Sequence, residues 1–312
     1  YIDIRENKYW YEKLENEYNL LKNSIAFFEK INSIENAIKI VDIDRFAKDY
    51  TDNFYEVDTL YRKIYFYYDS IEDKDIFINL KNKIENIYVN DFMSELSIKW
   101  SDMIENMPKY DSNRMTLQKD FYKNYIKPFN DKKDRIIVII SDAFRYECAK
   151  ELNSKLKNFA SKSDIGYMQG IVPSYTKLGM ASLLPNKELS RVKDSDDILV
   201  DGQVSSSLKD RELLLQKENI DSIAVKYDDL YEMTKLEWKK LFSGKKVVYI
   251  YHDTIDNAGE HNENTIFTAC DKAINELEKL VRDLHTTFSG INAFITADHG
   301  FFYKRGKIES YE

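Results

Sequence analysis

The amino-acid sequence predicts an α/β protein in which helices sandwich a mostly parallel sheet and an all-helical region precedes it. Short β-branched and aromatic runs recur from residue 135 onward, and stretches with helical periodicity separate them. Strands that alternate with helices in this way are joined by right-handed crossovers and lie parallel. Residues 1 to about 130, in contrast, have apolar residues three or four positions apart and contain no glycine.

The region 1–130 is predicted to form four to six helices, as either a coiled hairpin or a small bundle. Its apolar rows include Trp10, Leu14, Tyr18, Leu21 and Ile25, then Leu60, Ile64 and Tyr67, then Phe92, Leu96 and Trp100. The polar run 127–134 is interpreted as a linker to a second domain over 135–312.

The second domain opens with RIIVII (135–140), a continuous β-branched run that is typical of a strand buried on both faces. Helices and strands then alternate along the chain. We predict helices over 144–156, from near Thr176, over 235–242 and over 265–286, and strands ending near Val172 and over 222–226, 246–251 and 292–296.

Composition narrows the class of protein. The chain has 312 residues, 43% hydrophobic and 32% charged, without eighteen consecutive apolar residues, which predicts a soluble protein with no membrane contact. Cys148 and Cys270 lie in apolar helical patterns without a CxxC spacing, so we expect a reducing, cytoplasmic location. The net charge of −8 argues against extensive, sequence-independent binding of nucleic acid, although a local basic groove remains compatible with it.

Acidic residues follow three of the predicted strands. Asp142 comes after 135–140, Asp253 and Asp256 after 246–251, and Asp298-His299 after 292–296. Any one of them could simply cap the next helix. Together they predict a site, because ligands bind beyond the carboxyl ends of parallel strands. Crowded carboxylates require a cation, and an Asp/His set suits Zn²⁺ or Mn²⁺ better than Ca²⁺.

The histidines and one threonine add candidates. All four histidines lie between 252 and 299; His252 and His261 flank Asp256 as ligands or neighbours of ligands, whereas His285 reads as a surface residue. Thr176 lies between a predicted strand and a helix. It is either a nucleophile that a metal activates or a helix cap without chemistry.

Four segments in order resemble the PglZ domain, a branch of the alkaline phosphatase superfamily found in bacterial phage-exclusion (BREX) systems. They are SDAFRYE (141–147), VPSYTKLGMASLLP (172–185), YHDTIDNAGE (251–260) and TADHGFFY (296–303). The resemblance covers about 135–305 and implies an alkaline-phosphatase-like fold. No such segment occurs in the helical region.

The resemblance also implies roles. Asp142, Asp298 and His299 would hold one metal ion, with Thr176 between two metals as the nucleophile, and Asp256 would belong to the other site. Many superfamily members have a histidine four residues after that aspartate; here Glu260 occupies the position and His261 follows. Members also supply a last histidine from well beyond the Asp-His-Gly segment. We therefore expect the second site to be incomplete or empty in a chain that ends at Glu312.

Two functions are compatible with these residues. The first is metal-dependent hydrolysis of a phosphate monoester or diester, nucleic acid included, through Thr176 and two divalent ions. Arg145 and Lys177 would contact phosphate, or else form surface salt bridges. The second is a scaffold that retains a degenerate metal site. In both, the partners are other subunits of a phage-defence complex.

Overall fold

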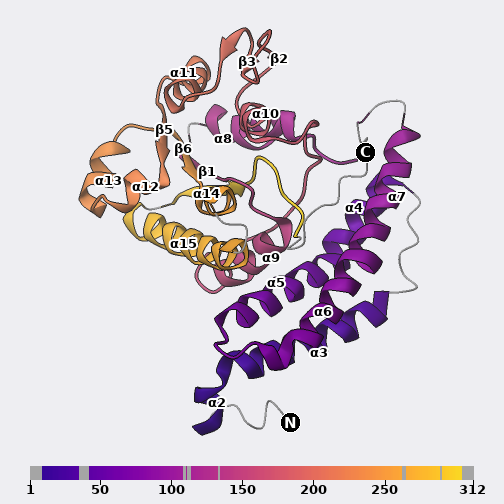
Figure 1. The fold of residues 1–312 in the computed structure, drawn as a ribbon. Helices are drawn as coiled ribbons and strands as arrows, with labels where there is room; N and C mark the ends of the chain where they lie inside the picture. Colours follow the sequence, from indigo (N-terminus) through magenta and orange to yellow (C-terminus); the bar gives the residue numbers. More distant parts are fainter. Residues whose placement is uncertain are drawn as a thin grey trace. The chain divides into compact units, whose positions relative to one another are not determined.

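The computed structural model describes residues 9–34, 42–107, 110, 114–132, 134–261, 265–288 and 290–303. The chain divides into two compact units: unit 1 comprises residues 1–110 and 302–312, and unit 2 comprises residues 111–301. Figure 1 shows the elements of each unit. Every helix among the described residues is too short or too polar to traverse a membrane. The sequence placed the domain division at 130–135, further along the chain than the division between residues 110 and 111. That the two parts can be separated stays a prediction.

The regular elements described in unit 1 are helices, which confirms the predicted N-terminal helical region (Figure 1). Short helical turns at Tyr50–Phe54, Asp75–Phe77 and Ile87–Met93 connect several of them. The helices are α2 (Tyr9–Lys13), α3 (Glu15–Ile34), α4 (Ile43–Asp49), α5 (Tyr55–Ser70), α6 (Ile78–Asn86) and α7 (Ser94–Glu105).

Helix α3 packs against α5. It buries Leu20, Phe27 and Ile34, which lie on one face at helical spacing. From the apolar row noted in the sequence, Leu14, Leu21 and Ile25 are exposed, and the side chain of Trp10 lies outside the described residues. Helix α3 is therefore apolar on two faces, and the packing against α5 uses the one that the sequence analysis did not select.

The core of unit 1 contains tyrosines with hydrogen-bonded hydroxyl groups. The ring of Tyr61 stacks on that of Tyr88 with centroids 3.6 Å apart. Tyr61 and Tyr65 both donate to Glu85, and Tyr88 donates to Asp58 at 2.7 Å. A buried phenol is stable when its hydroxyl finds a partner, so these pairs let unit 1 bury large aromatic rings.

Unit 2 is built on a four-stranded parallel sheet in the order β5-β6-β1-β7, which confirms the predicted fold class. The central strands β1 and β6 are buried along their whole length, as the β-branched runs predicted. The strands are β1 (Ile136–Ser141), β5 (Ser222–Lys226), β6 (Val247–His252) and β7 (Asn292–Thr296).

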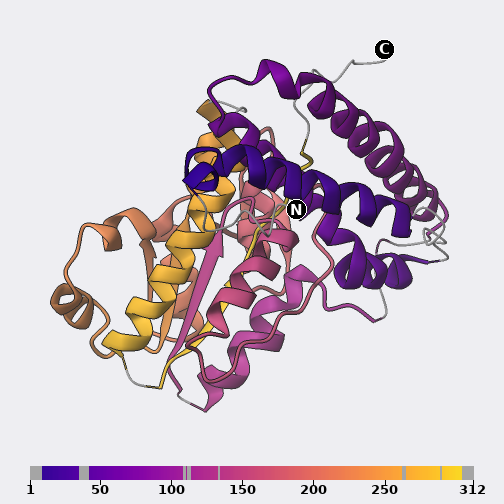
Figure 2. The same ribbon diagram turned by 90° about the horizontal axis from the view of Figure 1, so that it is seen from below.

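Helices cover both faces of this sheet (Figures 1 and 2). One core joins alternate residues of β1, such as Val138 and Ile140, to α10 (Thr176–Ser182) and α11 (Leu208–Glu218). On the other face, α15 (Ile266–Thr287) packs against α9 (Tyr146–Leu156) and α14 (Thr254–His261). The period of two along each strand thus divides the apolar residues between two helical layers.

The remaining elements of unit 2 are short. An antiparallel sheet in the order β2-β3-β4 contacts α10 through β3. Single helical turns lie at Gln118–Asp120 and Tyr122–Ile126. The other elements are α8 (Lys127–Asp131), β2 (Leu189–Arg191), β3 (Ile198–Val200), β4 (Gln203–Val204), α12 (Tyr227–Tyr231) and α13 (Lys235–Leu241).

Two local predictions are wrong. The strand expected to end near Val172 is replaced by an extended segment, and the isolated bridge found there among the described residues joins Leu117 and Gln169. The N–H of Ile171 donates its hydrogen bond to the side chain of Gln118, so it is not available to pair with a neighbouring strand. The polar run predicted as a linker is helical over Lys127–Asp131, with proline near its start, where a missing N–H costs nothing.

Candidate metal centre

Three neighbouring strands bring acidic side chains to the carboxyl edge of the sheet. Asp142 follows β1 directly, Asp253 follows β6, and Asp298 lies two positions after β7. Because β1 lies between β6 and β7, Asp142 is the central residue of the three. The N–H of Asp142 donates to the carbonyl of His252 at 2.8 Å, so the pairing of β1 with β6 continues up to the site.

The first group consists of Asp142, Asp298 and His299, whose ligand atoms lie within 4.8 Å of one another. His299 Nε2 is 3.5 Å from Asp142 Oδ1 and 3.4 Å from Asp298 Oδ2. Asp298 Oδ1 accepts a hydrogen bond from the N–H of Ala143 at 3.2 Å. Ala143 has a φ of 57°, which is uncommon for a residue with a Cβ and recurs at functional sites. The structure thus brings together three residues that the sequence singled out.

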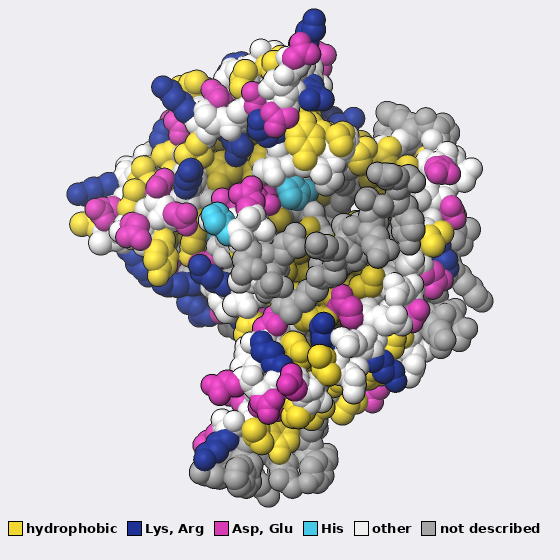
Figure 3. Space-filling view, viewed as in Figure 1, with side chains coloured by type: hydrophobic (Ala, Val, Ile, Leu, Met, Phe, Trp, Pro, Cys, Tyr) yellow, Lys and Arg dark blue, Asp and Glu magenta, His cyan; other side chains and the backbone are white. Residues whose placement is uncertain are grey.

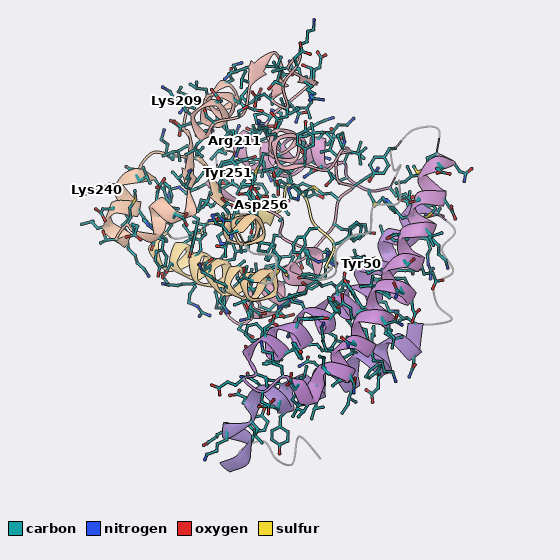
Figure 4. The ribbon with its side chains drawn as sticks, in the orientation of Figure 1. Tyr50, Lys209, Arg211, Lys240, Tyr251 and Asp256 are labelled. Atoms are coloured by element: carbon teal, nitrogen blue, oxygen red, sulfur yellow. The ribbon has the colours of Figure 1, made fainter. Side chains whose placement is uncertain are left out.

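The second group consists of Asp142, Asp253 and Asp256, again within 4.8 Å, so Asp142 is common to both groups. Asp256 lies in the first turn of α14, and Figure 4 labels it. Sequence reasoning placed Asp253 at this edge of the sheet but did not give it a ligand role; its position directly after a buried strand was the available signal. Glu260, four residues after Asp256, is exposed and belongs to neither group of described residues.

Thr176 is the first residue of α10. Its Oγ1 lies 3.0 Å from Nε2 of His299, the same nitrogen that faces Asp142 and Asp298. The other ring nitrogen, Nδ1, lies 3.1 Å from the carbonyl oxygen of Gly300. A proton on Nδ1 satisfies that carbonyl and leaves a lone pair on Nε2. The threonine hydroxyl and the first group of ligands therefore converge on one atom.

Two contacts fix the Asp298–His299 segment. A Cβ added to Gly179 of α10 would meet the carbonyl oxygen of Asp298 at 2.5 Å, so only glycine permits this approach. The buried Gln118 donates from Nε2 to the carbonyl oxygens of Ala297 and Asp298, and its Oε1 accepts from the N–H of Ile171 at 2.9 Å. Sequence reasoning missed Gln118, because no pattern around it indicates a contact 180 residues away.

Burial and like charges disfavour ionised carboxylates here. Burial, followed by the charges of Asp298 and Asp256, raises the pKa of Asp142 to about 9. Burial also raises the pKa of Asp298. Asp253 is the most exposed carboxylate of the second group, and its partial burial together with the charge of Asp256 raises its pKa as well. Asp142 Oδ1 and Asp298 Oδ2 are buried and have no hydrogen-bond partner within the described chain. A divalent cation would neutralise these charges and complete the coordination of both oxygens.

The two predicted phosphate contacts are engaged in other interactions. Lys177 Nζ lies 2.7 Å from Asp196 and 2.8 Å from Asp197, which precede β3. The guanidinium of Arg145 donates to the carbonyl oxygen of Phe301 and lies over its ring. Figure 4 also labels Arg211, whose guanidinium lies 4.8 Å from the ring centre of Tyr251 near the end of β6.

The two histidines around Asp256 differ in environment. His252 is buried between β6 and α15, where it contacts Ser141 and Glu276. His261 is exposed, and its Nδ1 lies 2.7 Å from the carbonyl oxygen of Asn257. Neither belongs to the two groups found in the described part of the chain. Acidic and histidine side chains nevertheless adjoin on the face of unit 2 shown in Figure 3.

A parallel sheet whose carboxyl edge presents these carboxylates, an imidazole and a helix-borne threonine defines an alkaline-phosphatase-like domain. The family described as "BREX system PglZ alkaline phosphatase-like domain" matches residues 121–312. The chain therefore belongs to the PglZ family of alkaline phosphatase-like domains.

Two curated proteins are similar over nearly the whole chain. Identity is 40% over 318 residues to the "Alkaline phosphatase-like protein PglZ" of Bacillus cereus (strain H3081.97), covering 99% of this chain and 37% of that protein. Identity is 33% over 321 residues to the "Alkaline phosphatase-like protein BrxZ" of Escherichia coli O9:H4 (strain HS), covering 97% of this chain and 36% of that protein. The chain thus spans a little over a third of the length of these relatives.

Proposed function

We propose that this domain is a metal-dependent phosphohydrolase with Thr176 as its nucleophile. The observation that carries the proposal is the 3.0 Å contact between Thr176 Oγ1 and His299 Nε2, at an atom that also faces Asp142 and Asp298. A structural helix cap has no need of such an arrangement, because capping uses backbone N–H groups of its own helix.

Two divalent cations, Zn²⁺ or Mn²⁺, fit the two groups. Asp142, Asp298 and His299 would hold one, and Asp142, Asp253 and Asp256 would hold the other. Glu260 lies one helical turn from Asp256 on α14. When bound, the cations polarise the phosphate oxygens and lower the pKa of the threonine hydroxyl.

The residues of the chain divide the reaction into two displacements. Thr176 Oγ1 forms a bond to phosphorus as the bond to the leaving oxygen breaks, and the hydroxyl proton goes to that oxygen. A monoester would give a phosphothreonine, and a diester would give a phosphodiester of Thr176 that keeps the second ester group. Water then attacks the same phosphorus, and Thr176 leaves as its hydroxyl. Asp298 would stay in place through both steps because Gln118 bonds its carbonyl oxygen and α10 packs closely against it at Gly179. The N–H of Ala143 fixes the orientation of the Asp298 carboxylate.

Membership of the PglZ family supports a role in a BREX system, and hence in phage defence with other subunits of that system. We propose a phosphodiester, in nucleic acid, as the substrate, and a cytoplasmic location. Lys177 is engaged in ion pairs and Arg145 in contacts with Phe301, and the net charge is −8. Contact with nucleic acid would therefore be local and would depend weakly on salt.

The test uses the longest natural chain that contains these 312 residues. Thr176→Ala should reduce turnover of a chromogenic phosphodiester at least about 100-fold and leave the metal content unchanged, because the carboxylates and imidazole remain. Asp298→Ala should lose metal and turnover together. The exposed Ser174→Ala is the matched control and should cost little.

Three results would change the proposal. If Ser174→Ala abolishes turnover and Thr176→Ala does not, the nucleophile is two residues earlier. If both variants remain active, water is the attacking group. If the protein binds two metal ions but hydrolyses neither phosphodiesters nor phosphomonoesters, the scaffold function is the better account.

A further inference from the structure

A cluster of polar side chains, two of them buried and two half-buried, adjoins the second group of carboxylates. It consists of Ser141, His252, Thr254 and Glu276, and we call it the His252 brace. Ser141 Oγ lies 2.9 Å from His252 Nδ1, and His252 Nε2 lies 3.1 Å from Glu276 Oε2. Thr254 Oγ1 donates to Glu276 Oε2 at 2.6 Å and lies 3.2 Å from His252 Nε2. Both ring nitrogens of His252 therefore have partners, and its side chain has no exposed surface.

The hydrogen-bond directions in the brace follow from its members. Thr254 uses its one hydroxyl hydrogen on Glu276, whose carboxylate only accepts. Nε2 of His252 therefore donates to Glu276, and in the tautomer with a single proton on Nε2 the other nitrogen, Nδ1, accepts from the Ser141 hydroxyl. This arrangement gives each of the four side chains a hydrogen-bond partner, and connected polar networks of this kind are rigid.

The brace joins the elements that carry the second group. Ser141 and His252 lie opposite each other in the register of β1 and β6 and immediately precede Asp142 and Asp253. Thr254 is the first residue of α14, which carries Asp256, and Glu276 comes from α15. All three carboxylates of the second group are therefore next to, or on the same helix as, a residue of the brace. None of the brace residues comes from β7, which leads to Asp298 and His299.

The order serine, histidine, glutamate is also that of a hydrolase triad, but the location excludes this role. Ser141 has no exposed surface. Its side chain contacts His252, whose other partner is on α15, in the layer between sheet and helices. A nucleophile must reach its substrate, so the cluster can act only through the residues beside it.

We infer that the His252 brace is a positioning device that sets the spacing of Asp142, Asp253 and Asp256 and thereby the metal affinity of the second group. Three carboxylates within 4.8 Å repel one another, so their backbone must be held while a cation enters. Groups that orient metal ligands from behind typically change affinity 10–100-fold when they are replaced. The inference rests on the proposed metal centre, and its test is chosen to separate the two.

The experiment titrates the metal-free protein with Zn²⁺ by calorimetry and measures the thermal midpoint in chelator. Wild type should bind two equivalents, and Asp256→Asn identifies the one that belongs to the second group. Glu276→Gln and Ser141→Ala should weaken that same equivalent about 10–100-fold and leave the other within about threefold. Ser222→Ala is the matched control: this serine of β5 is equally buried, but its Oγ bonds the carbonyl oxygen of Asn219 at 2.6 Å, away from the brace.

Each outcome of the titration supports or refutes the inference. If wild type binds no Zn²⁺, the metal centre and the brace both fail. If wild type binds two equivalents and both brace variants match it, the metal centre stands and the brace is refuted. A parallel loss of both equivalents, seen in Ser222→Ala as well, would show a general loss of structure and also refute the brace. If Glu276→Gln does not fold, Ser141→Ala decides alone, because it removes one hydroxyl.

Discussion

Gly179→Ala sets two physical effects against each other. Gly179 lies inside α10, where alanine should stabilise the helix by about 1 kcal/mol. The added Cβ, however, would meet three atoms of Asp298: the carbonyl oxygen at 2.5 Å, the carbonyl carbon at 2.8 Å and the Cβ at 3.0 Å. Two of these are backbone atoms, which cannot swing away. Overpacking of this kind costs about 1–3 kcal/mol, so the net loss of folding stability should lie between about 0 and 2 kcal/mol.

Activity should fall much further than stability. Ordinary contact distances are about 3.5 Å or more, so relief of the clash requires Asp298 to move by roughly 1 Å. A displacement of that size at a reacting centre costs about 100-fold in rate. Denaturant unfolding and phosphodiester turnover measure the two effects. Gly166→Ala is the control, since nothing lies within 4 Å of its added Cβ. A Gly179→Ala protein that is about 1 kcal/mol more stable and fully active would refute the close approach.

Three further predictions follow from the site. Asp253→Asn should reduce the number of tightly bound metal ions measured by elemental analysis, whereas Glu260→Gln, at an exposed position outside both groups, should not. Gln118→Ala leaves buried backbone groups of Asp298 and Ile171 without their partner, so chemical denaturation should show a loss of about 1–3 kcal/mol; a change below about 0.5 kcal/mol would contradict this account. The pKa of Asp142 is raised to about 9, so the metal-free folded state binds a proton more tightly than the unfolded chain. Stability in chelator should therefore decrease as pH rises from about 4 to 9, and Asp142→Asn should remove that part of the slope in the thermal midpoint.

The sheet and part of its site could be predicted from the sequence because both depend on local sequence patterns. The run 135–140 could be recognised as a buried strand since a parallel strand covered on both faces has no polar alternation. Asp142, Asp298 and His299 could be expected together because strand ends of a parallel sheet meet at one edge. Thr176 followed from its place in a resembling segment, and its contact with His299 is a tertiary result.

The parts that could not be predicted depend on contacts between distant residues. Helix α3 has apolar residues on two faces, and periodicity alone cannot say that Leu20 and Phe27 pack on α5 while Leu21 and Ile25 are exposed. Gln118 contacts the Asp298 segment across 180 positions without any local pattern. The expected strand near Val172 failed for the same reason, because that side chain supplies the partner that a neighbouring strand would have supplied.

The position of Asp142 at the centre of the sheet edge has a thermodynamic consequence. As a member of both groups, Asp142 would contribute one carboxylate to two binding equilibria. The occupancy of one group must then change the affinity of the other, and linkage requires the two effects to be equal in size. Replacing Asp142 should accordingly weaken both equilibria at once, whereas replacing Asp256 or His299 should act mainly on one. A single residue next to the strand β1 would thus couple the two binding events, while Asp298 and His299 keep the first group largely independent of the second.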